Sequence, residues 1–408
     1  MGAGRRRLVL TTAVGGIGLS LYAGFLTVDD VRDRAASERD IAAACDHLVS
    51  GARVMELRGG MVRAESDDWD KYRLDVRHLP SACTIYKTTD GSHKSTDLFR
   101  LIVRSSDGSE TVNRAGHVHA PFSTFDDHLR PKDDPTAVAG INPEEWPLGD
   151  GTLGSYTNFR TVIRAECGPG SDDKAPGLLK VTAVALYPEV SAGDRRRLAD
   201  IAHSAMRQLT HRTGCRTRLA ALPDRMTPVP SRLAPAVSAG GSCGWAGRLV
   251  KEEGNDRLPD RALAIPARDA NPVESCLLAV GPDRVRAVAD GLDGDQRDYV
   301  EGALTTSPWW LRTVSYFGAE ADSVSLDTLD GEVRLKPGTA GGGQGDWWAS
   351  SVCNGKPALH TLATASPYDR VLGPKTISSL FRAYVDDITA RRGCTHVTYP
   401  TAKDFGEG

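Results

Sequence analysis

The residues best suited to metal chemistry lie in one short stretch of the first half of the chain. His117-Val-His119 spaces two imidazoles two residues apart, and Asp126 and His128 follow closely. Side chains alternate along a strand, so both histidines would share one side of it. Imidazole and carboxylate groups together could ligate Zn²⁺. The alternative is a polar loop without a metal, because several prolines interrupt the stretch.

Carboxylates of the same region could catalyse hydrolysis. Asp126, Asp127, Glu144 and Glu145 could converge in the fold as a general acid and base. The sequence contains no His-Glu-x-x-His motif. A hydrolase, metal-assisted through the His117/His119 region, is therefore one of the functions that these residues leave open.

Two tryptophan pairs are candidates for binding a partner. Trp309-Trp310 and Trp347-Trp348 stand out in a chain with only 6% aromatic residues, and both pairs lie on expected strands. Neighbouring residues of a strand point to opposite faces, so one tryptophan of each pair should lie near the surface. Tryptophan is enriched at interfaces. The alternative is that both faces of this sheet are covered.

Eight cysteines divide into two sets of four with nearly equal spacing. The steps are 38, 84 and 48 residues in the first set, and 33, 77 and 41 in the second. No C-x₂₋₄-C pair occurs, which argues against a zinc-thiolate site. An even number of regularly spaced cysteines indicates a disulfide framework outside the cytoplasm. The cysteines are Cys45, Cys83, Cys167, Cys215, Cys243, Cys276, Cys353 and Cys394.

Four cysteines in each half allow three pairings. We expect sequential pairs, because Cys167 and Cys353 each end an expected strand while Cys215 and Cys394 follow the helix that packs on that sheet. A bridge at this place would join the end of the helix to the end of the strand. The other two expected pairs are Cys45–Cys83 and Cys243–Cys276.

The N-terminus has the pattern of a membrane anchor. Residues 1–7 contain three arginines, and residues 8–28 contain no charge. A helix of that length would span about 31 Å, close to the thickness of the hydrocarbon core. The arginines place the N-terminus in the cytoplasm, so the expectation is a single-pass protein of the cell membrane with its bulk outside. A cleaved signal peptide is the alternative, and it places the rest of the chain outside as well.

The elements that must position these residues repeat in the two halves. In each half an expected strand runs into a cysteine, and a turn and a second apolar strand follow. An amphipathic helix, over 191–212 or 374–391, then ends at Gly-Cys. Residues 283–304 are an additional expected helix. Glycine-rich stretches at 147–154 and 337–345 precede the strand-to-cysteine units, and we interpret them as flexible turns because no helix follows them.

This repetition predicts an α+β fold, a tandem duplication of a disulfide-stapled domain in which a helix packs on an antiparallel sheet, after one transmembrane helix. The first domain covers 29–220 and the second 242–400. A Pro/Ala-rich linker at 221–241 separates them, and 401–408 form a tail. With 408 residues the chain is long enough for both domains to bury a core.

The charge balance argues against nucleic-acid binding. The formal net charge is −3, and the run of three arginines at residues 5–7 precedes the expected anchor. Binding to phosphates would call for a basic face or tail.

The Arg-rich start with one anchor, the repeated cysteines and the helix that closes on Gly-Cys together resemble duplicated, membrane-anchored envelope proteins of high-GC actinobacteria. Pro147-Leu-Gly-Asp-Gly-Thr-Leu-Gly154 before the strand-to-cysteine unit belongs to the same pattern. The resemblance covers most of the chain and implies location and architecture. It implies no activity and transfers no catalytic residue.

The expected function is therefore that of a non-catalytic, extracytoplasmic binding protein of the cell envelope, without a cofactor. Its partners would be the bilayer, through residues 8–28, and an envelope protein or wall component. The alternative is an extracytoplasmic hydrolase.

Overall fold

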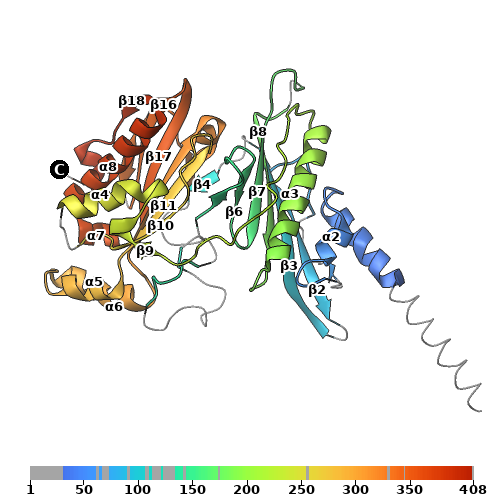
Figure 1. The fold of residues 1–408 in the computed structure, drawn as a ribbon, viewed down its shortest axis with the longest axis horizontal. Helices are drawn as coiled ribbons and strands as arrows, with labels where there is room; N and C mark the ends of the chain where they lie inside the picture. The colour runs from blue at the N-terminus through green and yellow to red at the C-terminus, as the bar shows by residue number, and fades with distance from the viewer. Residues whose placement is uncertain are drawn as a thin grey trace, which may run out of the picture.

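The computed structural model describes residues 31–60, 64–66, 73–89, 92–105, 110–112, 121–122, 134–140, 144–172, 175–253, 257–328, 331–343 and 345–406. The expected anchor at 8–28 lies outside these residues. Among the residues that are described, no helix is long and apolar enough to cross a bilayer. The structure is of the mixed α/β class, with antiparallel sheets and four disulfides (Figure 1).

The first half of the chain forms a seven-stranded antiparallel sheet. Its strand order is β1-β2-β3-β8-β7-β6-β5. Residues 31–44 are helical and precede the sheet. The elements are α2 (Gly51–Met55), β1 (Ala64–Glu65), β2 (Ser81–Thr89), β3 (Ser92–Ser105), β4 (Glu110–Val112), β5 (Trp146–Pro147), β6 (Gly154–Tyr156), β7 (Arg160–Glu166), β8 (Leu178–Ala185) and α3 (Ala192–Arg212).

The second half forms an eight-stranded sheet of order β15-β16-β17-β12-β11-β10-β9, with β18 paired to β16. Its elements are β9 (Ala234–Pro235), η2 (Ala236–Ser238), η3 (Gly241–Cys243), α4 (Gly244–Glu253), β10 (Arg261–Ala264), β11 (Val273–Ala279), α5 (Pro282–Ala289), α6 (Gly294–Thr305), β12 (Trp310–Phe317), η4 (Gly318–Ser323), β13 (Val324–Thr328), β14 (Gly331–Arg334), β15 (Gly341–Gly343), β16 (Asp346–Cys353), β17 (Lys356–Thr364), α7 (Tyr368–Leu372), α8 (Pro374–Arg392), β18 (Cys394–Thr398) and η5 (Ala402–Phe405).

The long helices form where the apolar period predicted them. In α3 the side chain of Ser191 accepts a hydrogen bond from the Asp194 backbone N–H, which caps the helix start. In α8 the helix starts at Pro374 and ends before Gly393, whose φ of 62° is the left-handed conformation that suits glycine. Both helices bury one apolar stripe against their sheets. Residues 282–305 form two helices, α5 and α6, instead of one.

The two sheets lie in the middle of the molecule and the long helices lie outside them. Figure 1 shows α3 on the outer side of the first sheet, and α4 and α8 on the outer side of the second. The helix-free faces therefore turn toward each other. A small third sheet joins the halves, because β4 pairs in parallel with β13, which also pairs with β14.

Each half has its own apolar core. Residues from the sheet, α3 and the N-terminal helix form the first, and the sheet with α4, α7 and α8 forms the second. Phe122 and Ala139 come from the first half of the sequence but join the second core. A smaller cluster around Tyr316, Val324 and Leu359 is separate from both.

The glycine-rich stretches are not simply flexible turns, so that expectation is wrong in part. The stretch at 147–154 leads into β6, and 337–345 contains β15, an edge strand paired with β16. A Cβ at Gly342 would lie 2.0 Å from Cδ1 of Trp347, and one at Gly341 would lie 2.6 Å from the ring of Trp348. Glycine is needed there because the indoles occupy the space of a side chain.

A cavity between the two sheets

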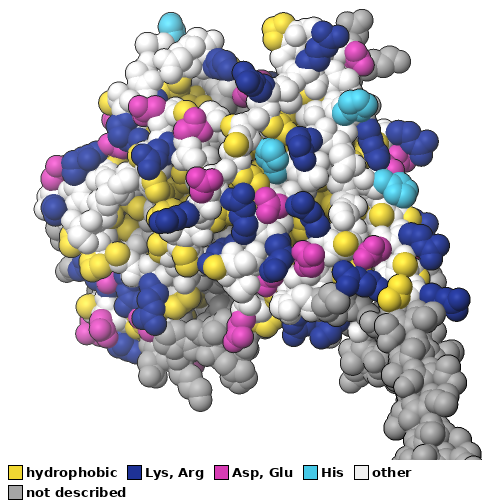
Figure 2. Space-filling model, turned by 45° about the vertical axis from the view of Figure 1, so that its right-hand side comes forward, with side chains coloured by type: hydrophobic (Ala, Val, Ile, Leu, Met, Phe, Trp, Pro, Cys, Tyr) yellow, Lys and Arg dark blue, Asp and Glu magenta, His cyan; other side chains and the backbone are white. Residues whose placement is uncertain are grey.

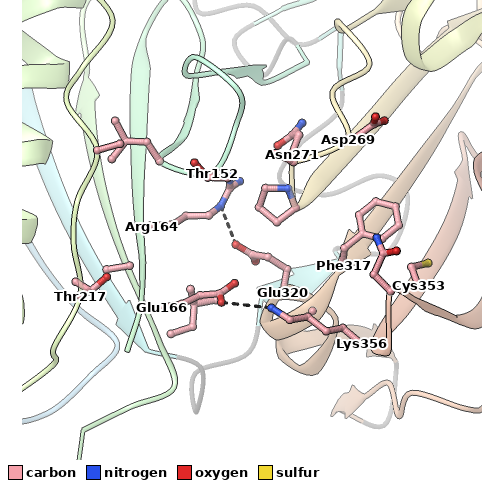
Figure 3. Close-up of a pocket in the computed structure, with 18 of the residues that line it drawn as sticks. Thr152, Arg164, Glu166, Thr217, Asp269, Asn271, Phe317, Glu320, Cys353 and Lys356 are labelled. Atoms are coloured by element: carbon pink, nitrogen blue, oxygen red, sulfur yellow. Dashed lines mark ion pairs between the residues drawn. The ribbon is translucent and has the colours of Figure 1, made fainter. Parts of the chain in front are cut away.

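The candidate functional site is a cavity of about 500 Å³ where the two halves meet. Residues of β7 and β8 line it from the first half, and residues of η4, α8 and the loop before β11 line it from the second. Figure 3 shows side chains from both halves converging on this space. Its walls combine buried charged groups with apolar groups, a composition typical of pockets for small molecules.

Glu320 is the central charged group of the cavity. It lies on η4 of the second half and is 1% exposed, yet both of its ion-pair partners belong to the first half. Arg164 Nε lies 2.7 Å from Glu320 Oε1, and Lys180 Nζ forms an ion pair with Oε2. Figure 3 shows the pair with Arg164 spanning the gap between the halves. Glu320 therefore ties η4 to the first sheet.

The first sheet brings its two cations together by strand register. Arg164 on β7 is directly opposite Lys180 on β8, so both side chains project from the same face of the sheet. Like charges in opposing positions repel each other. The carboxylate of Glu320 offsets that repulsion, and all three groups are buried.

Arg164 has hydrogen-bonding capacity that the described residues do not use. Its Nη2 donates to Ser155 Oγ at 3.4 Å. Nη1 has no hydrogen-bond partner among the described residues. The Nε–H does not point along the short line to Glu320, so that contact is an ion pair without a hydrogen bond. Arg164 is one of the residues that line the cavity.

Arg392, at the end of α8, lines the same cavity. Its guanidinium donates to the backbone carbonyls of Asp269 and Asn271, pairs with Glu274 at 3.4 Å, and lies 4.4 Å from the centre of the Phe317 ring. Nε has no hydrogen-bond partner in the part of the chain that is described. Burial lowers the pKa of Arg392 below the usual value for arginine.

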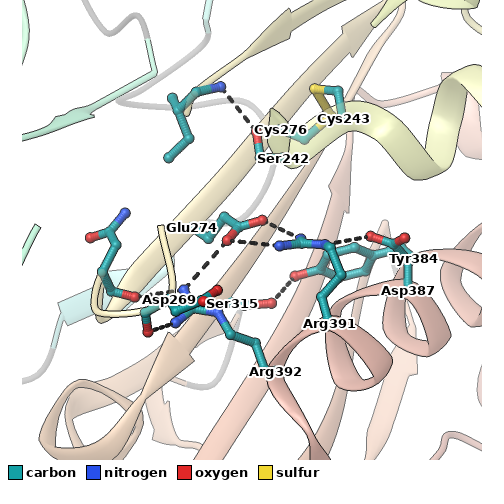
Figure 4. A network of polar contacts seen from close by, with 12 residues as sticks. Ser242, Cys243, Asp269, Glu274, Cys276, Ser315, Tyr384, Asp387, Arg391 and Arg392 are labelled. Atoms are coloured by element: carbon teal, nitrogen blue, oxygen red, sulfur yellow. Dashed lines mark hydrogen bonds and ion pairs between the residues drawn. A yellow bond between two sulfur atoms is a disulfide. The ribbon is translucent and has the colours of Figure 1, made fainter. Parts of the chain in front are cut away.

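Arg392 belongs to a larger polar network that fixes α8 on the second sheet (Figure 4). Glu274 on β11, 3% exposed, pairs with both Arg391 and Arg392. Oδ2 of Asp387 lies 3.0 Å from Nε of Arg391, and the same carboxylate forms an ion pair with Arg248 of α4. The network holds Arg392 in place at the cavity wall.

The rim of the cavity is exposed and carries charges of both signs. Glu166 and Lys356 form an ion pair of 3.8 Å across it. Arg218 and Asp269 are further exposed lining residues. In the wider view of Figure 2, basic and acidic side chains are interspersed over one face of the molecule.

Of the carboxylates expected to serve a hydrolase, the two that the structure describes are ion-paired. Glu145 lies 2.5 Å from Arg160 and accepts a hydrogen bond from Ser155. Glu144 is 2% exposed and pairs with Arg312 of β12 at 2.7 Å. Asp126 and Asp127 lie outside the described residues. Glu144 therefore supplies another ion pair between the halves.

The expected metal ligands His117, His119, Asp126 and His128 also lie outside the described residues. Within the described ranges, no group of three or more His, Cys, Asp or Glu side chains is arranged to hold a metal ion.

The tryptophan expectation is wrong for the first pair. Trp309 and Trp310 are both buried, at 1% and 8% exposure, and Trp309 stacks on Tyr368 of α7. In the second pair Trp347 is buried against Phe405, whereas Trp348 is partly exposed. Tyr368 of α7 covers Trp309 and Phe405 of η5 covers Trp347, so these rings are not at an open face of the sheet.

All eight cysteines form the sequential disulfides expected from the sequence. Cys167–Cys215 and Cys353–Cys394 each join a strand end to the residue beyond the long helix. The other two bridges are Cys45–Cys83 and Cys243–Cys276. All eight cysteines are in disulfides, so no free thiol is present to act as a nucleophile or a metal ligand.

A buried histidine forms a separate polar cluster under α8. His360 is 0% exposed, and its ring nitrogens contact Ser315 Oγ and Ser351 Oγ, each at 2.8 Å. Ser315 also contacts the hydroxyl of Tyr384 at 2.5 Å. Burial lowers the pKa of His360 to about 3, so its imidazole is neutral. This arrangement resembles a Ser-His pair, but its complete burial leaves no access for a substrate.

Sequence reasoning missed Arg164, Lys180 and Glu320, which no motif marks. A signal was present, because Arg164 and Lys180 each have apolar neighbours on both sides within β7 and β8. A basic residue in such a strand requires a buried partner. The sequence does not reveal which carboxylate supplies it.

Comparison with known proteins gives no relative. No protein-family model, curated protein or solved structure matches the chain.

Proposed function

We propose that this chain is a binding protein of the cell envelope, and that the cavity between its two halves holds a small-molecule ligand. The observation that carries this proposal is the cavity itself, whose walls come from both halves and include buried charged side chains. Sites for small molecules occur preferentially where domains meet, because such junctions combine concave shape with polar groups from separate elements.

The two halves are proposed to be copies of one domain. The sheet orders β1-β2-β3-β8-β7-β6 and β10-β11-β12-β17-β16-β15 correspond strand by strand. In each half one disulfide joins the second of these strands to a preceding helical segment, and the other joins the end of the fifth strand to the residue after the long helix. Duplication accounts for both agreements at once, and it places the cavity between related domains.

The protein is further proposed to stand outside the cell membrane on an anchor formed by residues 8–28, with its N-terminus in the cytoplasm. The uncharged segment after three arginines supports the anchor. The four disulfides support an oxidising compartment. Protease added to intact spheroplasts should degrade the protein, and the protein should remain in the membrane fraction at high salt. Protection from protease before lysis would contradict this topology.

The binding function is tested on the full-length protein, purified in detergent after expression in an oxidising compartment. A library of small anionic, neutral and cationic compounds is screened by thermal shift. Thr152, exposed at the cavity, is replaced by Trp to fill the opening, and Thr306, exposed at the end of α6 and not lining the cavity, is replaced by Trp as the control.

We expect compounds that stabilise the wild-type protein and the Thr306→Trp variant but not Thr152→Trp. The proposal fails if no compound stabilises the wild type, or if the Thr152→Trp variant responds equally well.

A further inference from the structure

The four disulfides differ in how far solvent can reach them. Two of them are closed off, because each of their four cysteines is at most 1% exposed. The other two, at the ends of the long helices, each join a buried cysteine to a partly exposed one. Thiol–disulfide exchange requires a thiolate to reach a sulfur atom. In the folded protein the candidates for exchange are therefore Cys167–Cys215 and Cys353–Cys394.

The sulfur of Cys353 accepts a hydrogen bond from a hydroxyl. Ser351 Oγ lies 3.4 Å from Cys353 Sγ, and the two side chains are on the same face of β16. A disulfide sulfur carries no hydrogen, so Ser351 is the donor in this contact. Among the described residues, no hydroxyl forms such a contact with the sulfurs of Cys167–Cys215. The hydrogen bond therefore distinguishes the two accessible bridges.

The direction of that hydrogen bond determines the direction of a longer chain. With its single proton directed at the sulfur, Ser351 accepts from Nε2 of His360 at 2.8 Å. Burial lowers the pKa of the imidazole and keeps it neutral, so Nδ1 accepts from Ser315, also at 2.8 Å. Ser315 in turn accepts from the hydroxyl of Tyr384 (Figure 4). Four donors thus point in one direction, and the chain ends at the sulfur of Cys353.

A chain of this kind stabilises a thiolate at Cys353. A hydrogen bond donated to the charged form lowers the pKa of a thiol, and aligned hydrogen bonds in a buried site strengthen one another. In thiol–disulfide exchange the thiol of lower pKa is the better leaving group. Attack is therefore directed to the partly exposed partner, Cys394, and Cys353 is the leaving group.

We infer that the Cys353–Cys394 disulfide is a site of thiol–disulfide exchange with an external dithiol. In the first step a thiolate of the dithiol attacks Sγ of Cys394, the S–S bond of the bridge breaks, and Cys353 leaves as a thiolate. In the second step the other thiolate of the dithiol attacks the dithiol's first sulfur in the mixed disulfide, and Cys394 leaves as a thiolate. The bridge gains the two electrons that the dithiol loses on becoming a disulfide.

The first test follows the order in which the bridges open in the full-length protein in detergent. The folded protein is treated with limiting dithiothreitol and quenched with iodoacetamide at a series of times, and peptide mass spectrometry locates the new thiols. Cys353–Cys394 should open about three- to tenfold faster than Cys167–Cys215, and the two buried bridges should stay closed. In a parallel reaction with glutathione, quenched with acid, the mixed disulfide should form on Cys394.

Ser351→Ala tests the assigned hydrogen bond. It should slow the opening of the Cys353–Cys394 bridge about three- to tenfold, because the leaving thiolate loses its donor, while the bridge of the first half keeps its rate. Ser351→Thr keeps the hydroxyl and should retain most of the rate. The matched control is Ser350→Ala, on the other face of β16, where Oγ has no hydrogen-bond partner among the described residues. It should leave both rates unchanged.

Three results would overturn the inference: equal opening rates of the two accessible bridges, glutathione attached to Cys353, or an unchanged ratio of the two rates in Ser351→Ala. Simultaneous opening of all four bridges would also overturn it, because that pattern indicates exchange through global unfolding. The wild-type measurements decide the inference even if Ser351→Ala does not fold. The exchange requires no ligand in the cavity, so its failure would leave the proposed binding function standing.

Discussion

Single residues in this protein carry large electrostatic consequences because they are buried. His360 illustrates this point, since its side chain is fully buried and its ring nitrogens contact the hydroxyls of Ser315 and Ser351. Desolvation alone holds its pKa at about 3, against an ordinary value near 6.5. The folded protein thus keeps this histidine neutral where the unfolded chain would protonate it.

This histidine predicts a pH dependence of stability. Below pH 6.5 the unfolded chain binds a proton at His360 that the folded state does not bind until the pH nears 3. The free energy of unfolding should therefore fall as the pH falls through that window, by about 1.4 kcal/mol per pH unit from this group. His360→Gln should remove that part of the slope, measured by urea denaturation at a series of pH values.

The control for this prediction is His211→Gln, at an exposed position near the end of α3. Its slope should match the wild type. A slope of His360→Gln that equals the wild-type slope would show that His360 does not titrate as described.

At the scale of elements, the edge strand β15 shows how side-chain volume decides secondary structure. A run of glycines has no intrinsic preference for a strand. Here the run pairs with β16, and it can do so because it has no side chains. Trp347 and Trp348 occupy the space that side chains on β15 would need. The glycines are thus part of the packing of the second sheet.

Gly342→Ala should therefore destabilise the protein. The added Cβ would lie 2.0 Å from Trp347, which is buried against Phe405, so the indole or the strand must move. We expect a loss of about 1–3 kcal/mol in the free energy of unfolding, as for overpacked sites. Chemical denaturation followed by tryptophan fluorescence measures it.

Gly294→Ala is the matched control, because a Cβ at that position of α6 meets nothing within 4 Å. It should be neutral or slightly stabilising, since alanine is the better helix former. Equal effects of the two substitutions would contradict the packing argument.

At the scale of the whole molecule, buried ion pairs link the two sheets. Glu320 of the second half joins Arg164 and Lys180 of the first, and Glu144 of the first half joins Arg312 of the second. Such pairs add little net stability when they are complete, but loss of one partner leaves an uncompensated buried charge. They therefore fix how the sheets face each other more than they strengthen the fold.

Glu320→Gln should accordingly weaken the junction between the halves. Arg164 and Lys180 would remain buried side by side without their shared carboxylate, and we expect a loss of about 3–5 kcal/mol. Hydrogen exchange should increase at η4 and along β7 and β8, while α8 keeps its protection. The measurement is hydrogen exchange by mass spectrometry together with urea denaturation.

Lys356→Gln provides the comparison, because its pair with Glu166 is exposed and 3.8 Å long. An exposed pair of this kind contributes at most about 1 kcal/mol. The role assigned to Glu320 is wrong if both substitutions have effects of that small size, or if exchange at η4 does not change.

The sequence by itself determined the parts of this protein that depend on local patterns. The apolar period with Ser191 and Pro374 at the helix starts predicted α3 and α8, and the spacing of the cysteines predicted the four disulfides, as the structure has them. These features were readable because caps, periodicity and strand-to-cysteine units span few residues.

Only the tertiary structure decided where the two halves meet and which residues form the cavity. Arg164 and Lys180 face Glu320 across more than a hundred residues of sequence, and the burial of Trp309 depends on α7, which follows it by some sixty residues. The sequence gives the types of these residues but not their neighbours. The pairing of a buried charge or the cover of an aromatic ring depends on how distant elements pack, and no local spacing encodes that choice.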